Sequence, residues 1–448
     1  MKRRLWILTI ALIALTLFQA GPAAAQQQLI VRTTQLPLLK EACLLNSCQV
    51  LGALDGTLNQ LFLVTVPNLV PIKLVEDVLK LVPGVLDVEV NSLLKIGSKV
   101  PLQNIPAGLY QRTPVNYFGS SVWMGYARQP AAGIIELPEA QAQFNVKGSV
   151  IVADIDTGVD FSHPALRAVL LQGYDFTRNR VGGNEMADVS NPVTQNCSNC
   201  QKAGVDQSTA AVLDQSTAAV LDQSTAAVLD SPQYSDFGHG TMVLGMVHLV
   251  APTTKLMPLK SFGSNGSGSL SNILAAIYYA VQNKANVVNM SFDFGSSYSA
   301  ELAQAIAYAE KNGVTCVASA GNEGESVAVY PAALAGVMGV GSTNDENQRS
   351  SFSNYGSQDV WVAAPGENII STFPYSTYAS ESGTSFTSPM VAGVAALVYQ
   401  MNGSASSQEV STAVAKTSPL DPSLGHGLLN VYKALAYVQA MLSNQNNQ

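Results

Sequence analysis

Residues 151–164 read IVADIDTGVDFSHP, a short apolar run that ends in an Asp-Thr-Gly turn. A run of this length, bounded by turn residues, is typical of a strand buried on both faces of a parallel sheet. Later runs of the same type are KLMPLKSF, ANVVNMSF, GVTCVASAG, GVMGVGS and VWVAAPG. Between them lie stretches with helical length and spacing, such as LSNILAAIYYAVQNK, AELAQAIAYAEKNG and SFTSPMVAGVAALVYQMN. This alternation predicts an α/β fold with a mostly parallel central sheet and helices on both faces.

Three motifs place a reactive side chain at the boundary of a predicted core element. Asp156 ends the first strand, His239 lies between two glycines in DFGHGTMVLGMV, and Ser385 lies in the turn of SESGTSFTSPMVAGVAALV. A serine hydroxyl is a good nucleophile only when a base removes its proton, and the base needs a carboxylate to fix its tautomer. Each motif alone also fits a turn or a helix cap. Together they supply the acid, the base and the nucleophile that nucleophilic acyl transfer needs.

The segments DIDTGVDFSHP, GHGTMVLGMV and SGTSFTSPMVAGVAALV resemble the signature motifs of the subtilisin-like serine proteases. The similarity continues through ASAGNEG, SFSNYG, VAAPGENIISTFP and GHGLLNVYKALAYV, and covers roughly residues 130–440. The resemblance implies a subtilisin-like three-layer fold, preceded by a small α+β propeptide domain. It implies a serine endopeptidase with Ser385 as nucleophile, His239 as general base and Asp156 as the carboxylate that orients the histidine. Asn322 matches the amide that, with the Ser385 backbone N–H, stabilises the oxyanion.

The resemblance also implies that substrate binds as an extended strand between two edges of the protein. The residues that match these edges are Gly266, Ser267 and Gly268 on one side, and Ser291, Phe292 and Asp293 on the other. The stretch GSNGSGS also fits a flexible loop. Glu323 matches an acidic position near the floor of the pocket for the side chain before the scissile bond. Asp293 and Glu323 would either favour a basic substrate side chain or point into water, and both alternatives stay open.

Two positions depart from the usual pattern. Ala165 in SHPALR stands where many members carry an aspartate that binds calcium, so the usual strong calcium site is in doubt. No metal ligand is assigned, and no cofactor is expected to be required. Asp154 lies two residues before Asp156, on the same face of a regular strand. A second buried carboxylate there is costly unless it is neutral or hydrogen-bonded.

The rest of the chain divides into regions of different composition. Residues 1–25 have a basic start, an apolar run and small residues before Ala25, which predicts a secretory signal peptide; an uncleaved anchor would need about 20 apolar residues. Residues 26–97 look like the family's propeptide, although a domain that is never removed fits as well. Residues 98–130 are predicted to form a linker with the processing region, and residues 131–448 the peptidase domain.

An insert at about residues 178–233 separates Asp156 from His239 and contains the octapeptide DQSTAAVL three times. Four polar residues followed by four apolar ones match neither the strand period nor a helical stripe. The sequence therefore predicts a surface insert, which either shapes the substrate cleft or has no role.

The cysteines leave several alternatives open. Cys43 with Cys48, and Cys197 with Cys200, could each form a disulfide in an oxidising compartment. A CxxC pair can instead bind zinc or act in redox chemistry. Cys316 lies in an apolar run and is expected to be a small buried hydrophobe.

Composition narrows the classes of function. The sequence is 47% hydrophobic and only 12% charged, which indicates a globular protein. A net charge of −8 argues against a general nucleic-acid-binding protein. We expect a secreted monomer, extracellular or periplasmic, with no membrane anchor after signal removal. It would act on polypeptides and be inhibited by its own propeptide. A catalytically silent binding protein, and a peptide ligase or cyclase with the same triad, remain the alternatives.

Overall fold

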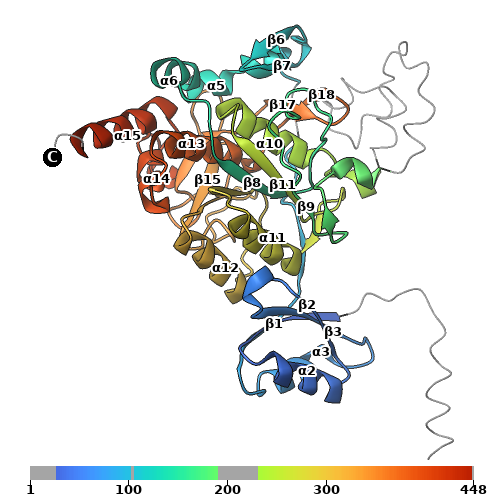
Figure 1. Ribbon diagram of the computed structural model, residues 1–448. Helices are drawn as coiled ribbons and strands as arrows, with labels where there is room; N and C mark the ends of the chain where they lie inside the picture. The colour runs from blue at the N-terminus through green and yellow to red at the C-terminus, as the bar shows by residue number, and fades with distance from the viewer. Residues whose placement is uncertain (1–26, 102–104, 190–230, 446–448) are drawn as a thin grey trace, which may run out of the picture. The chain divides into compact units, whose positions relative to one another are not determined.

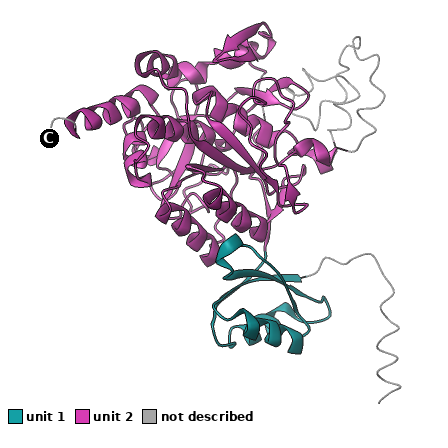
Figure 2. Cartoon of the chain, viewed as in Figure 1, with its two compact units in different colours: residues 1–91 teal, residues 92–448 magenta. Residues whose placement is uncertain are grey.

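The computed structural model describes residues 27–101, 105–189 and 231–445, and the chain divides into two compact units, Met1–Asn91 and Ser92–Gln448 (Figure 2). The predicted signal peptide, the octapeptide repeats and the Cys197–Cys200 pair lie outside the described residues. None of the described helices is both long and apolar enough to cross a membrane.

The first unit is an antiparallel sheet packed against two helices (Figure 1). The strand order is β2-β3-β1-β4. Leu29, Val64 and Val88 from the sheet pack with Leu39 and Val75 from the helices to form a separate core. The elements are β1 (Gln27–Thr33), α2 (Leu36–Leu45), β2 (Gln49–Ala53), the 3₁₀ turn η1 (Gly56–Leu58), β3 (Leu61–Val66), α3 (Ile72–Leu79) and β4 (Val85–Val90).

The cysteines of the described chain are free thiols. Cys43 and Cys48 are buried in the core of the first unit, and the Cys48 amide donates to the Cys43 carbonyl at 2.9 Å. The disulfide considered between them is not formed in this structure. Cys316 is fully buried, as expected for a small hydrophobe.

The second unit is built on an eight-stranded sheet in the order β10-β9-β11-β8-β13-β14-β15-β16. All neighbours pair in parallel except β9 and β10. The six apolar runs of the sequence form strands β8, β11, β13, β14, β15 and β16, so the prediction of a parallel sheet is confirmed. The bounds are β8 (Ile151–Asp156), β9 (Tyr174–Asp175), β10 (Arg180–Val181), β11 (Lys255–Lys260), β13 (Val287–Met290), β14 (Thr315–Ser319), β15 (Val337–Thr343) and β16 (Val362–Pro365).

Helices cover both faces of this sheet (Figure 1). Helices α10 and α13 pack on each other over one face, and α11 and α12 lie together on the other. Every residue of α10 is buried, which explains why its sequence is apolar all round. A Cβ atom at Gly393 would lie 2.6 Å from the Cβ of Val250, so glycine permits the close crossing of α13 and α10.

The helices of the second unit begin with recognisable caps. The hydroxyls of Ser269, Ser299 and Ser406 each accept a backbone N–H of the first helical turn. The bounds are α10 (His239–Val250), α11 (Leu270–Gln282), α12 (Ala300–Lys311), α13 (Ser388–Met401), α14 (Ser407–Val414) and α15 (Val431–Gln445). Shorter elements are β5 (Leu93–Lys95), β12 (Ser267–Ser269), β17 (Ile369–Phe373), β18 (Thr377–Glu381) and the 3₁₀ turns η3 (Glu185–Asp188), η4 (Pro232–Tyr234), η5 (Thr384–Phe386) and η6 (Pro422–Leu424).

The segment predicted as a linker differs from that expectation. It buries Leu109, Val122 and Tyr126 in the main core of the second unit. Tyr126 donates a hydrogen bond to the Gly245 carbonyl of α10 at 2.6 Å. This part of the chain is therefore folded into the second unit. Its elements, with those that follow, are η2 (Ala107–Tyr110), β6 (Pro114–Tyr117), β7 (Ser120–Trp123), α4 (Met124–Ala127), α5 (Pro130–Ile134) and α6 (Leu137–Phe144).

Candidate active site

Asp156 and His239 form a buried pair where β8 ends and α10 begins. The Nδ1 atom of His239 lies 2.9 Å from both carboxylate oxygens of Asp156. Burial lowers the pKa of His239, but the charge of Asp156 and the hydrogen bond to it outweigh burial and raise the pKa to about 9. With Nδ1 held by the carboxylate, Nε2 is left as the basic nitrogen. The pair is therefore arranged as a general base with its orienting acid.

Close packing at the start of α10 holds this pair together. A Cβ atom at Gly240 would lie 2.2 Å from the Gly158 carbonyl oxygen, so only glycine lets the helix approach the Asp-Thr-Gly turn this closely. The Gly240 amide donates to the Thr157 hydroxyl at 2.9 Å. The glycine that follows His239 is thus a packing requirement of the site.

A buried carboxyl group, Glu185, lies behind the same turn. It accepts hydrogen bonds from the Gly238 amide at 3.0 Å, from the Thr157 hydroxyl at 3.2 Å and from the Thr241 hydroxyl. Burial is the main reason that its pKa is raised to about 8. The sequence analysis missed Glu185, because it precedes α10 by more than fifty residues and belongs to no recognised motif. A lone acid in a Gly- and Asn-rich stretch carries no signal that would have revealed it.

Ser385 lies in η5, directly before α13. Its side chain is buried, and its Oγ donates to the Ser291 carbonyl at 3.3 Å. The Ser291 hydroxyl donates in turn to the Ser385 carbonyl at 2.9 Å. This reciprocal pairing ties the serine turn to the end of β13. In this structure Ser385 Oγ is therefore bonded to that carbonyl and not to His239.

The side-chain amide of Asn322, which follows β14, is fixed in one orientation. Its Oδ1 accepts from the backbone N–H and the hydroxyl of Thr384, at 2.9 and 2.8 Å. Nδ2 takes no part in the bonds to Thr384, and it donates to the Ser98 carbonyl at 2.9 Å. An amide locked next to the serine and directed at a peptide carbonyl has the geometry of an oxyanion donor.

One predicted substrate edge is formed as a strand. Ser267 and Gly268 belong to β12, which pairs antiparallel with β5 of the same unit, and the Gly266 carbonyl accepts from the Ile96 amide at 2.9 Å. On the other edge, Phe292 is buried against Phe262 and Phe294.

Asp293 and Glu323 are the two acids whose role the sequence left undecided, and they lie next to residues 97 and 98. A Cβ atom at Gly97 would lie 2.3 Å from Oδ2 of Asp293, and Glu323 accepts from the Ser98 hydroxyl at 3.1 Å. Burial, followed by the charge of Glu323, raises the pKa of Asp293 to about 6. In this structure, therefore, both side chains contact the chain itself and do not simply point into solvent.

Asp154 is buried between β11 and β13. One of its oxygens accepts from the Asn289 amide at 2.9 Å, and the other has no hydrogen-bond partner. Burial, and then the charge of Asp156, raise the pKa of Asp154 well above its usual value. Both influences favour the protonated, neutral form of the Asp154 carboxyl group.

Two observations on the described residues concern metal binding. Ala165, at the position where calcium ligation was in doubt, is fully buried and has no side-chain oxygen. No group of three His, Cys, Asp or Glu side chains in residues 27–101, 105–189 and 231–445 is placed to hold a metal ion.

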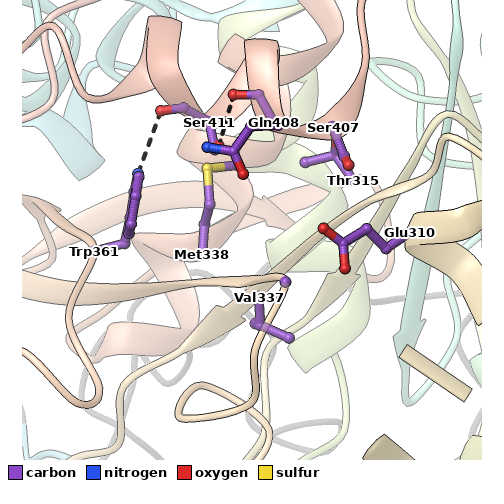
Figure 3. A pocket seen from close by; sticks show the side chains of 9 residues that line it. Glu310, Thr315, Val337, Met338, Trp361, Ser407, Gln408 and Ser411 are labelled. Atoms are coloured by element: carbon purple, nitrogen blue, oxygen red, sulfur yellow. Dashed lines mark hydrogen bonds between the residues drawn. The ribbon is translucent and has the colours of Figure 1, made fainter. Parts of the chain in front are cut away.

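A pocket lies at the opposite end of the parallel strands, where β14 and β15 begin (Figure 3). Thr315 and Val337, which line it, are the first residues of β14 and β15, whereas Asn322 follows the last residue of β14. The pocket is therefore separated from the site by the length of the strands. Its other lining residues are Glu310, Gly336, Met338, Trp361, Ser407, Gln408 and Ser411.

Comparison with known proteins agrees with this geometry. The model of the subtilase family matches residues 147–440. M-protease of Shouchella clausii is 42% identical over 204 residues, which cover 44% of this chain and 52% of that protein. Subtilisin Savinase of Lederbergia lenta is 41% identical over 209 residues, 44% of this chain and 77% of that protein. A thermophilic serine proteinase of a Bacillus species is 33% identical over 288 residues, 64% of this chain and 61% of that protein.

The match thus spans about half the length of M-protease and about three quarters of Subtilisin Savinase. The family match covers well over half of this chain and includes Asp156, His239, Asn322 and Ser385. Taken together with the parallel sheet and the buried Asp–His pair, it shows that the chain belongs to the subtilase family.

Proposed function

We propose that this chain is a secreted serine endopeptidase, made as a zymogen, that hydrolyses polypeptides through an acyl-enzyme on Ser385. The observation that carries the proposal is the fixed amide of Asn322, which lies beside the serine turn and donates to a peptide carbonyl at 2.9 Å. The Asp156–His239 pair supplies the base where β8 ends and α10 begins. Relatives at about 40% identity are named proteases.

The proposed reaction has two halves, acylation of Ser385 and hydrolysis of the resulting ester, and the same groups act in both. His239 Nε2 takes the proton of Ser385 Oγ as the oxygen attacks the scissile carbonyl, and then gives it to the leaving amine. Asn322 Nδ2 and the Ser385 amide stabilise the negative charge on the carbonyl oxygen. Removal of one such donor in a subtilisin costs about 3 kcal/mol of transition-state stabilisation. Water then repeats the sequence on the ester and releases the second product.

The proposal also covers inhibition by the preceding segment, secretion, cofactors and oligomeric state. The segment that precedes the peptidase region would act as an intramolecular inhibitor, because residues 93–95 already fill the β12 edge where a substrate strand would bind. Secretion rests on residues 1–25, and no metal or other cofactor enters the reaction. We expect the working form to be a monomer.

The test compares the wild-type protein with Ser385→Ala. Both are expressed as full chains and assayed on a denatured protein and with a serine-directed covalent probe. Hydrolysis and labelling by the wild type alone support the proposal. A folded, processed wild-type chain that is neither labelled nor active would overturn it. Product analysis with an added amine separates hydrolysis from peptide ligation.

A further inference from the structure

Residues 92–100 of this chain lie along the site in the manner of a substrate. Strand β5 pairs antiparallel with β12, with Leu94 opposite Gly268 and Lys95 opposite Ser267. The pairing extends on both sides, through the Leu270 amide to the Ser92 carbonyl at 3.0 Å and the Ile96 amide to the Gly266 carbonyl at 2.9 Å. An extended segment added to a strand edge by backbone hydrogen bonds is the common form of peptide recognition.

Beyond Ile96 the segment contacts Asn322 and residues close in sequence to His239 and Ser385. The Ser98 carbonyl accepts from Asn322 Nδ2 at 2.9 Å, and its hydroxyl donates to Glu323 at 3.1 Å. Val100 then forms an antiparallel bridge with Ser382, three residues before the candidate nucleophile. The carbonyl held by the amide is thus flanked on both sides by backbone pairing.

The residue after this carbonyl is also anchored. Lys99 Nζ lies 3.9 Å from a carboxylate oxygen of Asp236, which immediately precedes the Phe-Gly-His turn of His239. The peptide bond between Ser98 and Lys99 therefore lies between a carbonyl bound by Asn322 and a side chain that approaches the histidine turn.

The residue before Ser98 lies close against Asp293. A Cβ atom at Gly97 would lie 2.3 Å from Asp293 Oδ2, so a larger residue would require the Asp293 carboxylate to move. The backbone of Gly97 is not in the left-handed region, so its conformation alone would accept other residues. Because Asp293 Oδ1 is held by the Gly295 amide at 3.1 Å, the carboxylate should disfavour residues larger than glycine at this position.

We propose that the Ser98–Lys99 bond is the bond this protein cuts in itself, and that Asp293 makes Gly97 a requirement for the cut. The proposal rests on the serine endopeptidase function given above. Ser385 Oγ attacks the Ser98 carbonyl carbon, and its proton passes to His239 Nε2. The C–N bond to Lys99 breaks, and the Lys99 nitrogen leaves as an amine with that proton. Water then cleaves the ester and releases the Ser98 carboxylate.

The first experiment identifies the new amino terminus. The full-length chain is expressed in the wild-type form and as Ser385→Ala, and the processed product is analysed by intact mass and amino-terminal sequencing. The inference expects Lys99 as the first residue of the wild-type product and an uncut Ser385→Ala chain. A product that begins at Ser98, or at any other residue, overturns the assignment. If that product still hydrolyses protein and takes the serine probe, the endopeptidase function stands while this inference fails.

The second experiment tests the role of Asp293. Gly97→Val should slow the appearance of the processed chain about tenfold to a hundredfold, the range expected for overpacking of a filled site. Gly97→Val combined with Asp293→Ala should recover most of the rate, because the second change removes the atoms that the new side chain would meet. Gly52→Val is the matched control, since a Cβ at Gly52 meets nothing within 4 Å. Unchanged processing in Gly97→Val, or no recovery in the folded double variant, overturns the requirement for glycine.

Discussion

His239 is subject to two opposing influences that set its protonation. Burial alone favours the neutral ring, but the charge of Asp156, 2.9 Å away, and the more distant Glu381 and Asp236 favour the imidazolium. The balance raises the pKa of His239 to about 9. Because the base must be neutral to accept the proton of Ser385, this balance determines the pH at which the protein works.

Activity should therefore increase with pH on the alkaline side. We expect kcat/KM on a small peptide substrate to rise with a midpoint near pH 9, as His239 loses its proton. Glu381→Gln should move the midpoint to lower pH, because it removes one of the charges that stabilise the imidazolium. The measurement is the pH profile of both proteins. A profile that is flat between about pH 6 and 10 would show that His239 is already neutral over this range.

The neutral state of Asp154 gives a second prediction. An asparagine has nearly the shape and hydrogen-bonding capacity of a protonated carboxyl group. Asp154→Asn should therefore keep kcat/KM within about threefold of the wild type, well under 1 kcal/mol. The pKa of Asp154 is higher in the folded protein than its ordinary value of 3.8, so the wild type loses folding stability as pH rises above 3.8. Asp154→Asn has no such group and should lose less stability between acidic and neutral pH. Thermal melting at several pH values measures this, and a variant with the wild-type slope would contradict it.

At the scale of elements, the site depends on how three chain segments are joined at the start of α10. The turn after β8 contacts the helix through Thr157 and Gly240, and η3 reaches both through Glu185. Lys260, at the end of β11, donates its buried ammonium to the Thr157 carbonyl and to Asp188, each at 2.7 Å. These contacts hold the ends of β8 and β11 and the first turn of α10 as one rigid group.

Glu185 should be a positioning residue in this group. Glu185→Ala leaves the buried Gly238 amide without its acceptor, which should lower the free energy of unfolding by about 1–3 kcal/mol. The loss of support for His239 should lower kcat more than it raises KM. Glu185→Gln should retain most of both quantities, because at a pKa of about 8 the group it replaces is protonated at neutral pH.

Urea unfolding and steady-state kinetics measure these effects. Glu310→Ala is the control, because Glu310 is exposed at the opposite end of the parallel strands (Figure 3) and such surface changes stay within about 0.5 kcal/mol. Equal behaviour of Glu185→Ala and this control would show that the network does not support the site.

At the scale of the whole second unit, α10 is buried by segments from distant parts of the chain. Tyr126 from α4 contacts His248 in the last turn of α10, with 3.0 Å between the phenol oxygen and Nδ1. Burial lowers the pKa of His248 to about 3. A histidine that is neutral in the folded protein and charged in the unfolded chain links stability to pH.

The protein should lose stability in acid for this reason. The depressed pKa means that the unfolded chain binds the additional proton between about pH 6.5 and 3, so stability falls as pH falls through this range. The slope from one such group approaches about 1.4 kcal/mol per pH unit. His248→Gln should flatten this part of the curve, whereas His426→Gln, which changes an exposed histidine, should not. Chemical denaturation at pH 3 to 7 tests this, and parallel curves for wild type and His248→Gln would refute it.

Sequence and tertiary structure determined different parts of this protein. The parallel strands and the motifs around Asp156, His239 and Ser385 were predictable, because each is encoded by a contiguous pattern: an apolar run long enough for a buried strand, followed by a turn with small residues. The predicted fold and family are confirmed on these patterns. The spacing of Asp154 and Asp156 showed that a second carboxylate there must be neutral or hydrogen-bonded, but not which of the two applies.

Residues 98–130 looked like a linker because they bury single side chains such as Leu109, Val122 and Tyr126 without any regular period. Nothing local in the sequence indicated that Glu185 would reach the start of α10, or that Ser98 would meet Asn322. Contacts of this kind join residues far apart in the chain, and they depend on where the strand ends and loops converge. The sequence alone therefore identified the strands and the reactive side chains, whereas only the packed structure decided which peptide bond and which supporting groups lie beside them.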